Sequence, residues 1–269
     1  MTSIAPDATR LLGQTPVRIA TLAGGALSDV LGLELADGRA VVAKSGPAPR
    51  TEAAMLRALR AAGAPAPAVI AADHRVLVME RLPDGGGISA AAWGALGAVL
   101  AGMHAATGPR YGWPEDYAFG AVAIPNAATP DWPGFWAERR LRPEIAHLPA
   151  DLAVRIRRLA ARLPGLLPAT PRPALLHGDL WTGNILVDGD RIAGLVDPAC
   201  YYGDPEVDLA MLSLFATPAP AFWARYGAPD AGWPRRRAIY QLWPAIVHMR
   251  LFGEGYRGLV ERSLAQAGA

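Results

Sequence analysis

The sequence has 269 residues, of which 52% are hydrophobic and 19% are charged, so it can bury a substantial core and is neither fibrous nor disordered. Its 26 lysines and arginines nearly balance its 24 aspartates and glutamates, which argues against the concentrated positive field that nucleic-acid binding usually requires. The single cysteine, Cys200, excludes an intramolecular disulfide and a multi-cysteine zinc site.

The start of the chain carries neither the basic nor the apolar segment of a signal peptide, so we expect a cytoplasmic protein. One stretch could resemble a membrane span, because no residue between Asp84 and Arg110 carries a formal charge. Its middle is mainly alanine and glycine, which contribute little transfer energy, so we interpret it as a helix buried within the protein. We therefore expect neither a membrane nor a nucleic acid as partner, and a monomer is the simplest expectation.

The first third of the chain shows the short apolar runs that are typical of β-strands. They cover residues 18–23, 30–35, 39–44 and 76–80. A helix is predicted over 51–59, because Met55, Leu56 and Leu59 fall on one face and Thr51 can cap its N-terminus.

From residue 83 onward helical periodicity dominates, at 88–106, 132–141, 151–163, 207–215 and 235–252. The exception is a hairpin signature, in which apolar runs at 184–187 and 192–196 flank a turn at 188–190. We predict an α+β chain. A small antiparallel-sheet N-terminal lobe covers residues 1–82 and ends in a hinge, and a larger helical C-terminal lobe covers residues 83–269.

The most informative residues lie in and before this hairpin. Asp179 and Asn184 are five positions apart, and Asp197 follows the second apolar run. Phosphoryl transfer needs a carboxylate at the acceptor hydroxyl and oxygen ligands for magnesium, and the protein-kinase catalytic loop has the same Asp-to-Asn spacing. The alternative is that these residues only cap turns. Spacing, residue types and the intervening strand together favour a phosphotransferase of bilobal, protein-kinase-like fold.

The N-terminal lobe gives an independent indication. Lys44 ends a predicted strand, where kinases place the lysine that grips the nucleotide phosphates. Glu52 shares the apolar face of the next helix, so we expect an ion pair with Lys44; the alternative is a solvated glutamate at a helix start. Gly24, Gly25 and Ser28 lie in a turn between the first two strands, where backbone N–H groups can approach phosphate oxygens.

The runs HGDLWTGNILV at 177–187 and DPACYYGDPEVDLAM at 197–211 closely resemble the fructosamine kinase (ketosamine-3-kinase) family, a branch of the aminoglycoside-phosphotransferase-like kinases. Segments 111–116, 132–141 and 240–256 are also similar to that family, so the resemblance covers most of the chain. It implies ATP and Mg²⁺ as cofactors. It also implies a small-molecule ketosamine, of the fructosamine or ribulosamine type, that is phosphorylated at the sugar 3-hydroxyl in deglycation.

Carried over residue by residue, the resemblance implies Asp179 as the base and Asn184 with Asp197 as magnesium ligands. Lys44 and Glu52 would form the phosphate-gripping pair. The resemblance also implies a hinge, where backbone groups of Glu80 and Leu82 meet the adenine, and an acceptor site beside Trp132 and Tyr202. Asp208 would brace the catalytic loop, and His177 would be a packed core histidine.

Trp181 lies two positions after Asp179, so its indole is expected to border the acceptor site and not the adenine pocket. An aromatic face can receive both the C–H faces of a sugar and a secondary ammonium. The alternative is that the ring packs between the catalytic loop and a neighbouring helix.

Within the kinase class, the segment between Asp197 and Asp208 contains no serine or threonine, which argues against a regulated protein kinase. Two other functions stay open. A catalytically dead nucleotide-binding module is one, although the intact catalytic residues argue against it. A kinase of an aminoglycoside or other hydroxylated amine is the other, and it would need acidic side chains to bind a polycation. Candidates for these are Asp131, Glu138, Asp204, Glu206 and Glu254.

Overall fold

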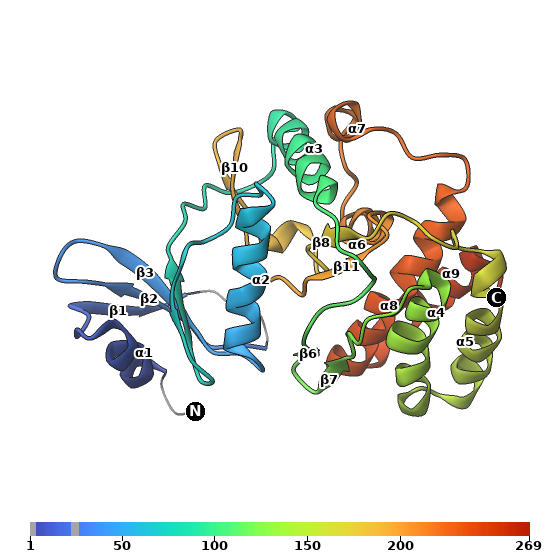
Figure 1. Ribbon diagram of the computed structural model, residues 1–269, viewed down its shortest axis with the longest axis horizontal. Coiled ribbons are helices and arrows are strands. Elements are labelled where there is room, and N and C mark those ends of the chain that lie inside the picture. The colour runs from blue at the N-terminus through green and yellow to red at the C-terminus, as the bar shows by residue number, and fades with distance from the viewer. Residues whose placement is uncertain (1–3, 23–26) are drawn as a thin grey trace.

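The computed structural model describes residues 4–22 and 27–269, which form two lobes side by side (Figure 1). The smaller lobe contains a five-stranded sheet in the order β1-β2-β3-β5-β4, with every neighbouring pair antiparallel. Its elements are α1 (Ala5–Leu12), β1 (Arg18–Thr21), β2 (Val30–Glu34), β3 (Ala40–Lys44), α2 (Pro49–Ala61), β4 (Val69–Ala72) and β5 (Leu77–Glu80). The predicted small antiparallel sheet is confirmed.

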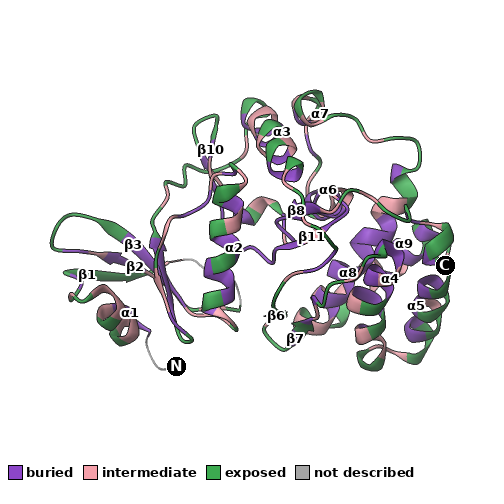
Figure 2. Cartoon of the chain, in the orientation of Figure 1, coloured by how far each residue is buried: buried purple, intermediate pink, exposed green. Residues whose placement is uncertain are grey.

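Strand β3 is buried on both faces, whereas β1 at the sheet edge is exposed along its length (Figure 2). Val41 and Ala43 pack in a cluster with residues of α1, and Val42 packs in the core that includes α2. Because side chains alternate along a strand, Lys44 lies on the same face as Val42. The alternation therefore directs Lys44 toward α2 and away from α1.

The larger lobe is mainly helical, as the periodicity predicts. Its helices are α3 (Ala90–Ala105), α4 (Trp132–Trp136), α5 (Ala150–Arg162), α6 (Glu206–Phe215), α7 (Pro220–Tyr226), α8 (Trp233–Phe252) and α9 (Arg257–Ala267). Three antiparallel strand pairs accompany them: β6 (Tyr117–Phe119) with β7 (Val122–Ile124), β8 (Ala174–Leu176) with β11 (Tyr201–Gly203), and β9 (Ile185–Asp188) with β10 (Arg191–Leu195).

The pair β9–β10 is the hairpin that the sequence predicts. The uncharged stretch after Asp84 becomes α3, whose N-terminus is capped by the Ser89 hydroxyl. Within the described ranges no helix combines the length and the apolar character needed to cross a membrane. The sheet ends at Glu80 and α3 begins at Ala90, and the lobe boundary at residue 82 stays a prediction.

Three details differ from the sequence prediction. Helix α2 begins at Pro49, so Thr51 lies inside it and its hydroxyl donates to the Glu115 carboxylate instead of capping. The helix predicted over 132–141 is α-helical only to Trp136 and then widens to a π-helical turn. The sequence analysis does not predict several further elements, since most of them are too short for hydrophobic periodicity to stand out; these are α1, β4, β6, β7, β8, β11, α7 and α9.

Candidate active site

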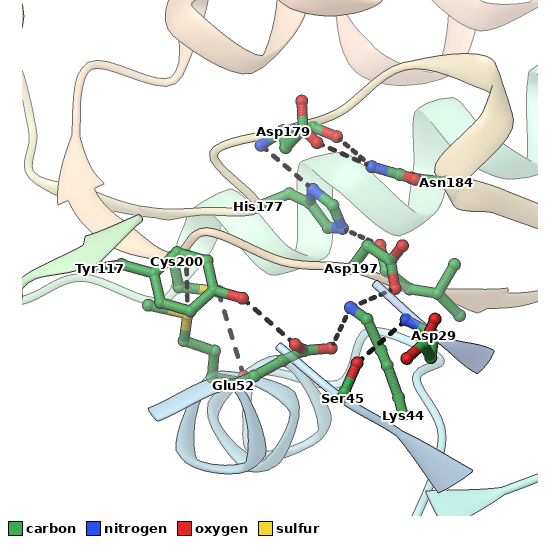
Figure 3. A network of polar contacts seen from close by, with 12 residues as sticks. Asp29, Lys44, Ser45, Glu52, Tyr117, His177, Asp179, Asn184, Asp197 and Cys200 are labelled. Atoms are coloured by element: carbon green, nitrogen blue, oxygen red, sulfur yellow. Dashed lines mark hydrogen bonds and ion pairs between the residues drawn. The ribbon is translucent and has the colours of Figure 1, made fainter. Parts of the chain in front are cut away.

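Lys44, at the end of β3, lies in a buried ion pair with Glu52 in the first turn of α2. Figure 3 shows this pair, in which the Lys44 Nζ is 2.7 Å from Glu52 Oε1. Both side chains are almost wholly buried. The other Glu52 oxygen accepts a 3.1 Å hydrogen bond from the Tyr117 hydroxyl of β6. The predicted pair is confirmed, and the solvated alternative for Glu52 is wrong.

Lys44 Nζ also lies 2.8 Å from Asp197 Oδ1 of the larger lobe, so one ammonium joins the two lobes. Burial by itself would lower the pKa of Lys44, but Glu52 and Asp197 outweigh burial and raise it. Asp197 has a φ of 56°, and it is the one non-glycine residue with positive φ in the part of the chain that the structure describes. Strained backbone of this kind concentrates at functional sites.

The loop between β8 and β9 brings Asp179 and Asn184 together. The Asn184 amide nitrogen donates to the Asp179 backbone carbonyl at 2.8 Å and to its carboxylate at 3.1 Å. These bonds use the nitrogen of Asn184 and leave its side-chain oxygen available to a cation.

Asp208, near the start of α6, lies beneath this loop. Its two oxygens accept the backbone N–H groups of His177 at 2.7 Å and Gly178 at 2.9 Å, and His104 Nε2 lies 3.1 Å away. Gly178 has a φ of 82°, and a β-carbon there would lie 2.0 Å from the Ala199 carbonyl oxygen. The loop therefore needs glycine where protein kinases have arginine.

His177 is fully buried under the same loop. Its Nε2 lies 3.0 Å from the Val196 carbonyl oxygen, and its Nδ1 accepts the Asp179 N–H at 3.3 Å. This pattern assigns the proton to Nε2, and burial lowers the pKa of the imidazole. His177 is thus a neutral ring that links the two ends of the catalytic segment.

Asp179 keeps part of its surface open to a cavity, but protein atoms surround most of it. This burial raises the pKa of Asp179 to about 7. The hydrogen bond from Asn184 lowers the pKa and the negative charge of Asp197 raises it, but burial has the largest effect. A carboxyl group that titrates near neutrality is suited to accept a proton from a hydroxyl.

Two cavities meet at these residues. The larger, of about 630 Å³, lies between the sheet and the β9–β10 hairpin and is lined by Val42, Met79, Leu82, Leu186 and Val196. The smaller, of about 170 Å³, lies between β6, the catalytic loop and α8 and is lined by Asp179, Phe119 and Trp243. Lys44, Asn184 and Asp197 line both. Lys44 and Asp197 therefore place charge at the junction, as expected if the larger cavity is a nucleotide cleft and the smaller an acceptor cavity.

The predicted nucleotide contacts lie partly at the larger cavity. Glu80 and Leu82 line it, and the Glu80 N–H is already engaged, because it donates to the Ala68 carbonyl oxygen at 2.9 Å. Ser28 lines the smaller cavity and not the larger one. Gly24 and Gly25 lie outside the described residues.

Trp181 lines both cavities, although the sequence places it at the acceptor side alone. The side chain is 39% exposed, so the alternative of a ring packed in the core is wrong. The indole lies over Gly183, where a β-carbon would come 2.2 Å from a ring atom.

The structure does not bring Trp132 and Tyr202 to either cavity. Trp132 is fully buried, stacks on Phe135 and donates to the Tyr240 hydroxyl at 2.9 Å. Tyr202, on β11, packs against Trp113. Aromatic residues in a motif specify core packing as readily as binding, and spacing alone does not distinguish the two.

The sequence analysis missed three parts of the site. The hairpin β6–β7 supplies Tyr117 and Phe119, and the second half of α8 supplies a wall of the smaller cavity. His104 completes the contacts of Asp208. The one sequence signal for these parts was the length of the apolar run in α8, which indicates a buried face. The contacting residues lie far apart in the sequence, so spacing does not connect them.

The two-lobed fold and the junction of Lys44, Glu52, Asp179, Asn184 and Asp197 define the class of protein, which is a phosphotransferase of protein-kinase-like fold. Residues 41–268 match the model of a family described as fructosamine kinase. The chain belongs to this family.

Individual relatives agree with this assignment. The chain is 37% identical over 210 residues to a probable ketoamine kinase of Synechocystis sp., covering 72% of this chain and 68% of that protein. It is 36% identical over 174 residues to the chloroplastic protein-ribulosamine 3-kinase of Oryza sativa subsp. indica, covering 61% of this chain and 51% of that protein. A crystal structure from Thermobifida fusca that carries the fructosamine-3-kinase name has a TM-score of 0.89 and 30% identity, with 99% of each chain covered.

Proposed function

We propose that this protein transfers the γ-phosphoryl group of ATP to the 3-hydroxyl of a ketosamine of the fructosamine or ribulosamine type. The observation that carries the proposal is the position of Asp179, whose carboxylate lines the acceptor cavity beside Lys44 and Asp197 at the nucleotide cleft. Family membership supports the ketosamine as the acceptor class.

In this mechanism Asp179 accepts the proton of the attacking hydroxyl, and Lys44, held by Glu52, binds the nucleotide phosphates. Asp208 and His177 keep the loop in register through their backbone contacts. Each of these groups is already in place, so little reorganisation is needed when substrates bind.

The residues at the junction also fit a magnesium ion. Asn184 has a free side-chain oxygen, Asp197 is 33% exposed, and both line the larger cavity. Mg²⁺ prefers oxygen ligands and usually binds through one or two carboxylates together with substrate phosphates and water. When bound, the ion would neutralise the charge of the phosphates. An AMP-PNP complex of an amicoumacin kinase of the same fold contains Ca²⁺, which supports a divalent cation.

The acidic residues considered for a polycationic acceptor do not line the acceptor cavity. Asp131 caps α4, Glu138 pairs with Arg142, and Glu206 forms two 2.6 Å hydrogen bonds with Arg236. Asp204 is buried and accepts the Tyr240 hydroxyl at 2.7 Å. Four of the five candidates are therefore already engaged. Glu254 is exposed and follows Phe252 by two residues, but it does not line the cavity. This distribution supports a ketosamine over an aminoglycoside.

The direct test is an ATP-consumption assay with fructosamine and ribulosamine substrates beside an aminoglycoside. We expect turnover of at least one ketosamine and a kcat/KM for the aminoglycoside that is lower by about 10²-fold or more. NMR of the product should place the phosphate on O3. Preferred turnover of the aminoglycoside, or of neither class, would contradict the proposal.

A second test concerns Trp181. Trp181→Ala is expected to raise the KM for the ketosamine severalfold, since an exposed indole at the cavity can contribute about 0.5–2 kcal/mol to binding a cation. The melting temperature should change little because the ring is not in the core. Trp223→Ala, on α7 outside both cavities, is the matched control and should leave the KM unchanged. An unchanged KM in Trp181→Ala would show that the indole does not contact the acceptor.

A further inference from the structure

The acceptor cavity has a second wall that none of the catalytic residues occupies. It is formed by the C-terminal half of α8, which lies beside the β6–β7 hairpin (Figure 1). We call this surface the α8 wall, and it consists of Trp243, Pro244, Val247, His248, Leu251 and Phe252. Phe119 of β6 faces it, with 6.1 Å between the ring centroids of Phe119 and Trp243.

The α8 wall carries no charge. Among the described residues that line this cavity, the charged ones are Lys44, Asp179 and Asp197, and all three lie at the catalytic end. His248 Nδ1 lies 2.8 Å from the Pro244 carbonyl oxygen and donates to it, and burial lowers the pKa of this ring. The imidazole is therefore neutral at neutral pH.

The wall leads from the catalytic end to the surface. Trp243 is 4% exposed, whereas Phe252 is 47% exposed. A strip of apolar side chains thus continues from the cavity into solvent. Its contact with water is unfavourable, and a ligand that covers it lowers the free energy. The cavity volume of about 170 Å³ is that of one ring-sized group, since an apolar cavity of about 150 Å³ binds benzene. A sugar at Asp179 therefore fills most of it, and the substituent on its amine extends along the apolar strip toward Phe252.

We propose, on the basis of the proposed function, that the α8 wall binds the amine substituent of the ketosamine and selects an uncharged apolar or aromatic one. The sugar has to lie at Asp179 for its hydroxyl to react, so the substituent on its amine extends toward the remaining wall. A second ammonium there would lose its hydration without meeting a carboxylate.

The test compares two ketosamines with the same fructose unit, one made from benzylamine and one from 1,4-diaminobutane. We expect kcat/KM to be at least about tenfold higher for the benzylamine derivative, mainly through KM. Phe252→Ala should reduce this preference about fivefold. Phe215→Ala is the matched control, because Phe215 is 46% exposed and also contacts His248 but does not line the cavity. It should leave the preference unchanged.

A charge introduced into the wall should reverse the preference. Leu251→Glu is expected to raise kcat/KM for the diaminobutane derivative about tenfold and to lower it for the benzylamine derivative. Melting temperatures of all three variants check that they fold. Equal kcat/KM for both derivatives in the unmodified protein, or an equal effect of Phe252→Ala and Phe215→Ala, would overturn the inference alone. Turnover of neither derivative, and of neither ribulose analogue made from the same two amines, would overturn the proposed function together with it.

Discussion

Asp179→Asn is expected to lower kcat by about 10³-fold, the middle of the range for removing a general base. The amide keeps the size of the side chain but cannot accept the proton of the acceptor hydroxyl. ATP binding should be nearly unchanged, because Lys44, Glu80 and Leu82 line the larger cavity and Asp179 does not. The measurement is steady-state kinetics together with nucleotide titration. Asp188→Asn, an exposed carboxylate on the next hairpin, should retain full activity.

The pH profile gives the same prediction a second readout. Because the pKa of Asp179 is raised to about 7, kcat/KM for the ketosamine should rise with pH through that value as the base ionises. Asp179→Asn should lose this dependence. Wild-type turnover in Asp179→Asn, or a profile that is flat between pH 6 and 8 in the unmodified protein, would contradict the assignment.

Asp179 should also lower the stability of the native protein at neutral pH. Its pKa is higher in the folded than in the unfolded state, so the native state binds the proton more tightly. The free energy of unfolding is therefore highest below about pH 4, near the unfolded pKa, where Asp179 is protonated in both states. It falls as the pH rises through about 7, because the folded protein then has to hold a buried charge. Asp179→Asn should therefore melt at a higher temperature than the unmodified protein at pH 8, and this gain should shrink toward pH 4.

Lys44→Met is expected to be the most damaging change in the smaller lobe. It removes the cation between two carboxylates, and breaking a buried pair in this way commonly costs about 3–5 kcal/mol. It also removes the proposed contact with the nucleotide phosphates, so we expect kcat/KM for ATP to fall by about 10²–10³-fold. Differential scanning fluorimetry and ATP kinetics measure the two effects separately.

Glu52→Ala should have a milder effect on ATP kinetics, because Asp197 still holds the lysine. The double variant should lose much less than the two single losses combined, since both changes disable one unit. Arg18→Met, which removes an exposed ion pair with Glu34 at the edge of the same sheet, should change neither stability nor kinetics appreciably. Additive losses in the Lys44 and Glu52 cycle would show that the two residues act independently.

The sequence determined the parts of this protein that depend on local spacing. Asp179, Asn184 and the hairpin before Asp197 follow one another along the chain, so residue types and turn signals were enough to predict them. Lys44 and Glu52 were predictable for a similar reason, because one strand and the first turn of one helix carry them. Alternation and helical periodicity fix the faces of such short segments without reference to the rest of the fold.

Only the tertiary structure decided how distant segments meet at the site. Tyr117 donates to Glu52, His104 contacts Asp208, and the α8 wall lies across the cavity from Asp179. It also placed Trp132 in the core, although its motif suggested the acceptor site. Such contacts depend on how amphipathic faces pack against one another, and a hydrophobic residue has the same local pattern whether a core or a ligand covers it.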